Sequence, residues 1–561
     1  MPAPTPDQPG PGQAADRLVR RAAALYLVIG LGLQGWRILT LNASYDQGTF
    51  LQEIWNGLRG HPFESSLASQ LSSAVLVHGT ALPSENYLHL AMHFTPLLIL
   101  WLPLVALLGV WSLPLIQVGG LTAGGLVLHR LARQELARQR QGERLAAWIT
   151  VSYFAAGMVI GPALENFHDF YPLPLLVFTL MLGISRRQLA LYLPAALLLP
   201  IVREDVGILA FGIGVWMVLR RPHWRWWGVG LAAYALLYVL VVTTLVMPAL
   251  GSEISERFMA ERFGQFLHGD TGSTWDVLLA MARQPLLVLA ELIQPLDRSL
   301  RFLVTIGLPL ALVPFLSIDV WLLMALPLFI ALVSQGKEGL SVFLRFVLLL
   351  VPGVFSGTVF WWRRHGGLFE RARFRRLWQA AIGLSLLFCL SGNPHRSLSF
   401  LVPDSVEPWV HFSPAQLLQR GLATRAVLAT IPADASVSAD TQLVPLLATR
   451  PVLLRFPHST SHRDRNGQRQ EVSLVVSQPR LLADYAPAFL QQARWFHSSA
   501  RRLTALVAGG TYGVRTCTPT VIVLQRGLDS GAAGQACLAR ELAAARAQLQ
   551  RRGDASDGGR I

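Results

Sequence analysis

Long apolar runs separated by short polar segments are the feature that most restricts how this 561-residue chain can fold. The first run extends from Ala22 to Leu41, and comparable runs recur as far as residue 391. Runs of about 18 or more apolar residues with almost no charge are typical of transmembrane helices, because the hydrocarbon core is about 30 Å thick. The sequence therefore predicts a mainly α-helical, polytopic transmembrane bundle of about 11–13 helices.

The positive charge is a signal of topology. The net charge is +15, and Lys337 is the only lysine, so arginine supplies nearly all of the positive charge. The arginines lie mostly in short segments between apolar runs, as at Arg186-Arg187 and Arg220-Arg221. This is the positive-inside pattern, so the charge indicates cytoplasmic loops and does not point to nucleic acid as a partner.

The basic segments divide the chain into expected regions. Residues 1–16 are expected to form a disordered cytoplasmic tail and residues 17–391 the membrane domain, with an outer loop at 42–93. Two runs, Phe94 to Val110 and Ser112 to Leu128, precede the next basic segment. Together with the first run they would give three crossings. The basic segments on either side are both expected in the cytoplasm, so the number of crossings between them should be even. One run therefore re-enters, lies at the membrane surface, or is wrongly divided.

The composition changes after residue 391. Residues 392–530 are predicted to form a soluble, extracytoplasmic α/β domain, and residues 531–561 a polar helix with a flexible tail. Short alternating runs indicate strands at 435–439, 451–457, 472–476 and 520–524. Helices are expected at Gln442–Ala448, Tyr485–Arg494 and Ala536–Arg552, and a polar loop at Ser459–Gln470.

The three cysteines give little information about fold or function. Cys389 lies in an apolar run and is expected to be inert, while Cys517 and Cys537 could pair, although nothing in their spacing demands it. No spacing typical of a metal site occurs.

Polar residues from several loops reach the outer surface on this map, among them Asp46, His93, Glu165, His168, Asp169, Arg203, Glu204 and Asp205. Charges at positions 203–205 would cost on the order of 8–10 kcal/mol at a helix centre, so they must lie at the interface or face a wet cavity. They could simply end helices there. Alternatively, acids with neighbouring histidine or arginine suit general-base work or cation-assisted handling of a phosphate leaving group.

Asp46, Arg203 and a further arginine, Arg345, have more specific interpretations. Asp46 follows the first membrane run and could deprotonate an acceptor, hold a cation, or cap a helix from Gln47 to Leu58. Arg203 and Arg345 could neutralise a phosphate, whereas Arg345 could equally extend to the membrane surface from its apolar run. A divalent cation is an option as cofactor, and the metal is left open.

The motifs resemble those of a family of predicted multi-pass membrane proteins, domain of unknown function 2079 (DUF2079). Tyr45-Asp46-Gln47-Gly48-Thr49-Phe50 with Ile54-Trp55-Asn56 resembles the family's first-loop motif. The later motifs are matched in order by His93-Phe94-Thr95-Pro96, Glu165-Asn166-Phe167-His168, Arg203-Glu204-Asp205, and Ile431–Ala439 with Leu446–Arg450. The resemblance extends over residues 20–525.

That family is similar in layout to the GT-C glycosyltransferases, which implies a GT-C-like bundle and sugar transfer from a polyprenyl-phosphate donor at the outer face of the plasma membrane. Carried over, the catalytic residues are Asp46, Glu165, His168 and Glu204, with Asp46 as acid or base. The implied substrate-binding residues are His93, Asp169, Arg203, Asp205 and Arg345. Asp46 is followed by Gln47, which departs from the usual first-loop acid pair and counts against a metal-dependent variant.

Two other function classes remain open. A transporter or lipid flippase predicts charged groups near the bilayer midplane, broken helices and an internal repeat. No convincing repeat is evident, and the charged motifs cluster towards one face. A non-catalytic scaffold predicts that the loops of Asp46, His93 and Glu204 do not converge.

Overall fold

The computed structural model describes residues 11–71, 81–251, 259–267 and 272–557. The chain forms two compact units. The membrane unit comprises residues 1–32, 90–98 and 114–395, and the α/β unit comprises residues 33–89, 99–113 and 396–561. Helix α1 (Pro11–Leu39) begins in the first unit and ends in the second. Because α1 starts at Pro11, residues 11–16 are helical, where the sequence was expected to give a disordered tail. Proline is well suited to a first helical position, where its missing N–H is not needed.

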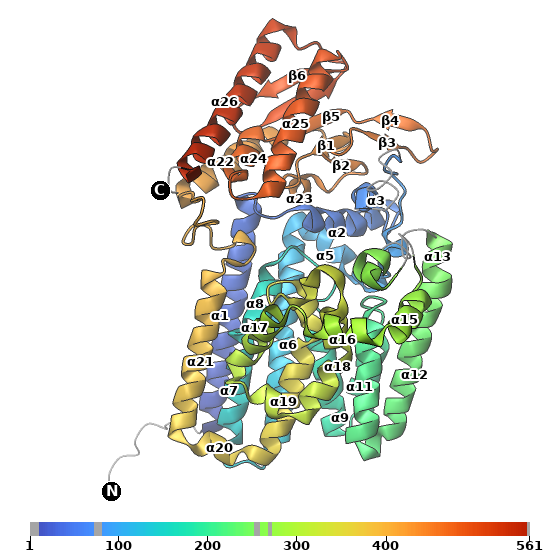
Figure 1. The fold of residues 1–561 in the computed structure, drawn as a ribbon, viewed down its shortest axis with the longest axis vertical. Helices are drawn as coiled ribbons and strands as arrows, with labels where there is room; N and C mark the ends of the chain where they lie inside the picture. The colour runs from blue at the N-terminus through green and yellow to red at the C-terminus, as the bar shows by residue number, and fades with distance from the viewer. Residues whose placement is uncertain (1–10, 72–80, 252–258, 268–271, 558–561) are drawn as a thin grey trace. The chain divides into compact units, whose positions relative to one another are not determined.

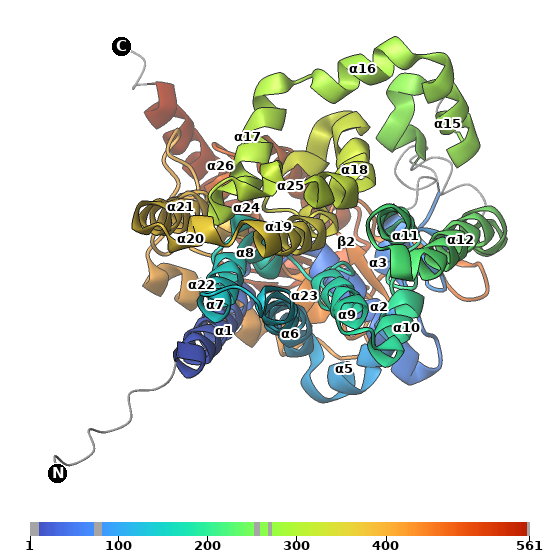
Figure 2. The same cartoon turned by 90° about the horizontal axis from the view of Figure 1, so that it is seen from below.

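The membrane unit consists of helices (Figures 1 and 2). They are α6 (Ser112–Leu136), α7 (Gly142–Phe154), α8 (Gly157–Leu164), α9 (Leu173–Arg186), α10 (Leu189–Leu198), α11 (Val206–Arg220), α12 (Arg225–Val241), α13 (Met247–Leu250), α15 (Thr274–Arg283), α16 (Pro285–Ile293), α17 (Leu296–Gly307), α18 (Ile318–Val333), α19 (Val351–His365), α20 (Gly367–Glu370) and α21 (Ala372–Ser391).

Several helices are long and apolar enough to cross a membrane. Among the described residues, four candidate spans pass this test, and a fifth is added if the bent pair α7 and α8 counts as one span. Four more apolar helices, α9, α10, α11 and α18, have 10–17 residues. The prediction of a multi-pass membrane protein built from helices is confirmed.

The run from Phe94 to Val110 explains the odd number of predicted crossings. It does not form its own membrane helix. It is divided into η3 (Pro96–Trp101), α5 (Leu102–Leu108) and η4 (Gly109–Trp111). Seven residues of α5 extend about 10 Å, far less than the roughly 30 Å of a bilayer core. The 25 residues of α6 are long enough, and the region up to Leu136 contains two candidate spans, Gly12–Leu39 and Pro96–Leu136, which is an even number.

Close backbone approach holds α11 against α12, which run side by side in Figure 1. A Cβ atom at Gly214 would lie 2.7 Å from the carbonyl oxygen of Gly228, so no larger residue fits at this crossing. Small residues at such crossings are typical of membrane helices. On another face of α11, Trp216 Nε1 and Arg220 Nε each donate to Asp319 Oδ1 of α18 at 2.9 Å.

The α/β unit contains a five-stranded sheet with the order β2-β1-β5-β7-β6. Strands β1, β2 and β5 are parallel, and β7 and β6 are antiparallel additions. The strands are β1 (Val437–Ala439), β2 (Leu453–Arg455), β5 (Leu474–Ser477), β6 (Tyr512–Cys517) and β7 (Ile522–Arg526). The helices are α2 (Tyr45–Asn56), α3 (Ser66–Leu71), α5, α22 (Pro414–Leu428), α23 (Val444–Leu447), α24 (Pro479–Tyr485), α25 (Leu490–Ala508) and α26 (Gly531–Asp557).

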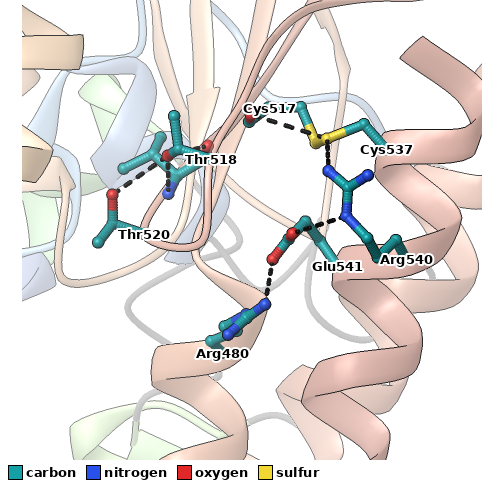
Figure 3. Close-up of a disulfide and its surroundings, with 8 residues drawn as sticks. Arg480, Cys517, Thr518, Thr520, Cys537, Arg540 and Glu541 are labelled. Carbon is teal, nitrogen blue, oxygen red and sulfur yellow. Dashed lines mark hydrogen bonds and ion pairs between the residues drawn. A yellow bond between two sulfur atoms is a disulfide. The ribbon is translucent and has the colours of Figure 1, made fainter. Parts of the chain in front are cut away.

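The core of the α/β unit lies between the sheet and two helices. Leu454, Val475 and Leu524 of the sheet cluster with Leu503 of α25 and Leu538 of α26. In Figure 1 the two helices run beside the strands. A disulfide joins Cys517, at the end of β6, to Cys537 of α26 (Figure 3), so the pairing that the sequence left open does form.

The four predicted strands of this domain are confirmed, but two other expectations are wrong. Ser459–Gln470 is a hairpin of β3 (Ser461–Arg463) and β4 (Arg469–Glu471), not a loop. Its turn contains Asn466-Gly467, and Gly467 has a φ of 77°, a conformation that favours glycine. The helix expected over Tyr485–Arg494 is interrupted between α24 and α25, where Pro487 cannot donate a helical hydrogen bond.

Candidate functional site

A carboxylate–imidazole pair lies in the membrane unit. Glu204 occupies the turn between α10 and α11, and its Oε1 lies 3.0 Å from His93 Nδ1. Its other oxygen, Oε2, accepts a hydrogen bond of 2.7 Å from the backbone N–H of Phe94. The side chains remain partly exposed, His93 at 31% and Glu204 at 12%. The geometry brings together two predicted residues 111 positions apart, in an arrangement that can accept or relay a proton.

Arg203 of the same turn is buried, and its guanidinium contacts two carboxylates. Its Nε and Nη2 donate to the two oxygens of Asp205 at 2.9 and 2.6 Å, and its Nη1 lies 3.4 Å from Asp169 Oδ2. The guanidinium also lies 4.0 Å from the centre of the Phe170 ring. Burial opposes the charge of Arg203, but the carboxylates of Asp205 and Asp169 more than offset this and raise its pKa. These contacts favour a role in holding the turn over direct phosphate binding.

Arg262, which the sequence analysis did not single out, extends the same cluster. Its Nη1 lies 3.8 Å from Asp205 Oδ2, and its side chain is 35% exposed. It is thus a cation close to the turn that still reaches solvent. Its position in an amphipathic piece of a long loop, beside Phe263, was the available signal.

Glu165 and Arg345 form a second ion pair in the membrane unit. Glu165 ends α8, and its oxygens accept from the backbone N–H of Arg345 at 2.6 Å and from Nη1 at 2.9 Å. Arg345 begins η11 (Arg345–Leu349), at the end of a candidate membrane span, so the predicted apolar run is broken there. The side chain of Arg345 is 25% exposed and that of Glu165 only 6%. Arg345 is therefore paired with an acid, which neither sequence interpretation included.

His168 is enclosed. Its side chain is completely buried, and Nε2 lies 3.2 Å from the carbonyl oxygen of Pro162. Burial lowers the pKa of His168, with Arg345 adding to the effect, so the imidazole is neutral at pH 7. A buried, neutral ring that contacts the backbone is better placed to hold the segment after α8 than to meet a substrate.

Gln117 of α6 is a second residue that the sequence analysis missed. Its Nε2 donates to the carbonyl oxygens of Pro162, Ala163 and Glu165 at 2.9, 3.4 and 3.1 Å. Its Oε1 accepts from the backbone N–H of His168 at 3.1 Å. The amide thus satisfies the backbone groups released where α8 breaks, as such breaks within a membrane require. A glutamine within an apolar run was the signal for this role.

Asp46 belongs to the α/β unit. It lies within the first turn of α2, whose N-cap is Ser44, so the prediction that Asp46 caps a helix beginning at Gln47 is wrong. A carboxylate in the first turn interacts favourably with the positive end of the helix dipole. The residue is half-buried. Because the other predicted site residues lie in the membrane unit, their convergence with Asp46 stays a prediction.

The neighbours of Asp46 in the first-loop motif are used for packing. A Cβ atom at Gly48 would lie 2.3 Å from Val444 Cγ1, which explains glycine where α2 meets α23. Gln52 Nε2 donates to the carbonyl oxygens of Arg450 and Pro451 at 3.0 and 3.2 Å. The first-loop motif and the motif that ends at Arg450 are therefore two sides of one packed interface within the α/β unit.

A buried acid–imidazole pair also lies in the α/β unit. Glu53 Oε1 is 3.2 Å from His89 Nδ1, and the side chains are 0% and 5% exposed. The burial of this pair distinguishes it from the pair of Glu204 and His93, whose side chains remain partly exposed. Among the described residues, no group of three or more His, Cys, Asp or Glu side chains is arranged to hold a metal ion.

Comparisons with known proteins identify a family. The chain is similar to the crystal structure of ArnT from Cupriavidus metallidurans bound to undecaprenyl phosphate, with 12% identity and a TM-score of 0.43 over 89% of this chain and 97% of the other. No curated protein matches the sequence. The family model described as predicted membrane protein (DUF2079) matches residues 37–523. The chain therefore belongs to the DUF2079 family of predicted membrane proteins, as its motifs suggested.

Proposed function

We propose that this chain is a GT-C-like membrane glycosyltransferase that moves a sugar from a polyprenyl-phosphate donor to an acceptor at the outer face of the plasma membrane. The observation that carries the proposal is the turn at residues 203–205. It brings a partly exposed acid–imidazole pair, Glu204 with His93, next to a partly exposed cation, Arg262, which lies beside Asp205. Sugar transfer from a phosphate needs a well-oriented donor and stabilisation of the leaving anion, and these groups are suited to both tasks.

The proposed reaction inverts the configuration at the anomeric carbon of the sugar. A carboxylate, assigned to Asp46, takes the proton of the acceptor hydroxyl while the hydroxyl oxygen attacks the anomeric carbon. The bond from that carbon to the phosphate oxygen breaks, and its electrons stay on the lipid phosphate. Arg345 and Arg262, which keep part of their surface exposed, would stabilise the growing negative charge. Glu204 would orient His93 beside the donor, with Glu165, Asp169, Arg203 and Asp205 holding the surrounding segments and His168 filling the space behind.

Glu204→Gln should lower the rate of sugar transfer by about 10- to 100-fold. The change removes the charge that holds His93 and the Phe94 N–H, and charge-assisted hydrogen bonds contribute about 1.5–3 kcal/mol each. The measurement is incorporation of radiolabelled sugar from polyprenyl-phosphate donors into membranes with matched amounts of protein. Glu407→Gln, an exposed site in the α/β unit, is the control and should keep full activity.

The same assay separates the competing classes. If wild type and Glu204→Gln transfer sugar equally, the assignment of this turn is wrong. If neither transfers sugar but the wild type moves a labelled lipid between leaflets of reconstituted vesicles, the transporter or flippase alternative replaces the proposal.

The proposal places the α/β unit outside the cytoplasm, which the Cys517–Cys537 disulfide supports because disulfides persist in oxidising compartments. We expect Arg494→Cys, on an exposed position of α25, to react with a membrane-impermeant maleimide in intact cells. Arg373→Cys, in the basic first turn of α21, should react only after lysis. Background should be low, because the one native free cysteine, Cys389, is buried. The reverse labelling pattern would contradict the orientation.

A further inference from the structure

A pocket of about 350 Å³ opens in the α/β unit, and no residue of the proposed transfer site lines it. Its wall includes Arg480, just after the carboxyl end of β5, and Thr520, just before β7 (Figure 3). In open α/β sheets, ligands bind outside the carboxyl ends of the parallel strands. Between β1 and β5 that edge is closed, because Asp440 accepts hydrogen bonds from Ser477 Oγ and Gln478 N. The available space is therefore one strand further along, where the pocket lies.

Arg420 of α22 enters the pocket from one side. Its Nη2 donates to Asp484 Oδ2 at 2.7 Å, and Gln548 Nε2 donates to the other oxygen of Asp484. Asp484 therefore fixes both side chains, and both of its oxygens are already occupied. Arg420 Nη1 is buried and has no hydrogen-bond partner within the described part of the chain. Behind it, the guanidinium lies 4.9 Å from the centre of the Phe412 ring.

Arg480, which also lines the pocket, is likewise held by a carboxylate. Its Nη2 lies 2.6 Å from Glu541 Oε2 of α26, a contact that Figure 3 displays. Its Nε is buried and likewise lacks a hydrogen-bond partner among the residues that the structure describes. Two arginines that are each held by a carboxylate thus each keep an N–H group without a hydrogen-bond partner among the described residues. Buried donors of this kind favour a ligand that supplies oxygen acceptors.

The charge, size and chemistry of the lining define a class of ligand. The charged residues that line the pocket are Arg420, Arg480 and Asp484, which leaves a net charge of +1. Guanidinium groups present planar pairs of donors that match carboxylate and phosphate oxygens. Gln416 and Thr520 add groups suited to hydroxyls, and Leu481 and Pro519 add apolar surface for a ring. Small-molecule pockets run from about 300 to 1,000 Å³, so this one accommodates a single sugar-sized group.

We propose that this pocket binds an anionic monosaccharide unit, a sugar that carries a carboxylate or a phosphate. The oxyanion binds between Arg420 and Arg480, and the ring hydroxyls face Gln416 and Thr520. The proposal concerns recognition by the α/β unit alone. It stands whether or not the membrane unit transfers sugar.

Binding to the full-length protein in nanodiscs tests this proposal. The probes are glucuronate, glucose 1-phosphate and uncharged glucose, titrated by calorimetry. We expect saturable binding of at least one anionic probe and at least tenfold weaker binding of glucose. Whichever anion binds more tightly distinguishes a carboxylate from a phosphate ligand. Arg480→Gln should weaken anion binding at least tenfold, whereas Arg494→Gln, on the exposed side of α25, should leave it unchanged.

A second variant separates loss of the site from loss of the fold. Leu481→Trp adds bulk to the pocket wall and leaves both arginines in place. This variant should unfold at the same temperature as the wild type and no longer bind the anionic probe. Equal binding of glucose and the anions, absence of saturable binding for every probe, or full binding by a folded Leu481→Trp protein would each overturn the proposal.

Discussion

Asp46→Asn should reduce sugar transfer by at least about 100-fold, because general-base catalysis typically contributes 10²–10⁴-fold. Asparagine has nearly the same size and shape as aspartate but accepts no proton at neutral pH. The change should cost little stability, since a charge in the first turn of a helix contributes only about 0.3–1 kcal/mol. The measurement is the initial rate of transfer from the polyprenyl-phosphate donor, with protein amount and unfolding temperature matched to the wild type.

The matched control for Asp46→Asn is Asp297→Asn. Asp297 also lies in the first turn of a helix, α17, and its side chain is 77% exposed. The control makes the same chemical change in a comparable helical position and should keep full activity. A folded Asp46→Asn protein with wild-type rates would remove Asp46 from the mechanism, and Glu204 would then be the remaining candidate base.

Gln117→Leu should lower the free energy of unfolding by on the order of 3 kcal/mol or more. Leucine fills a similar volume but satisfies none of the three carbonyl oxygens and the one N–H that Gln117 now contacts. Each buried polar group left without a partner costs about 1–3 kcal/mol. The measurement is thermal or denaturant unfolding of the protein in one defined detergent, followed by a signal from the membrane helices.

Thr122→Val on the same helix is the control for Gln117→Leu. The Thr122 hydroxyl donates only to Val118 O of its own helix, at 2.7 Å, so its loss should cost less than about 1 kcal/mol. The Gln117 variant should also transfer sugar more slowly, because Glu165 lies at the end of the segment that Gln117 holds. Unchanged stability in Gln117→Leu would mean that another group satisfies the break after α8.

Much of the fold could be predicted because its signals are local. Apolar runs identify membrane helices, and alternating short runs identified four strands of the mixed sheet, β1, β2, β5 and β7. The errors arose where length or turn chemistry outweighed composition. The run from Phe94 to Val110 is apolar enough for a span but is divided around α5, and the polar segment with Asn466-Gly467 was too short and hydrophilic to be recognised as a hairpin.

The candidate site was partly predictable. Ordered motifs placed Glu204 and His93 at one surface, and the structure joins them. The pairing of Glu165 with Arg345 joins residues 180 positions apart, and no periodicity in one sequence encodes such a contact. For the same reason the roles of Arg262 and Gln117 depend on neighbours that only the folded chain provides.

Because α2 packs against the C-terminal part of the α/β unit, this unit can reach its native structure only late in synthesis. The side chain of Gln52 donates a hydrogen bond to the carbonyl oxygen of Arg450, which is synthesised 398 residues later. At ribosomal rates of about 5–20 residues per second, this interval is about 20–80 s. Throughout that time α2 can contact nearby elements such as α3 and α5 but lacks α23 and the segment at Arg450 and Pro451, although the first membrane helix has already been made. A nascent chain therefore cannot hold Asp46 in its final position until nearly all of the protein has been translated, and chains truncated before residue 444 should never do so.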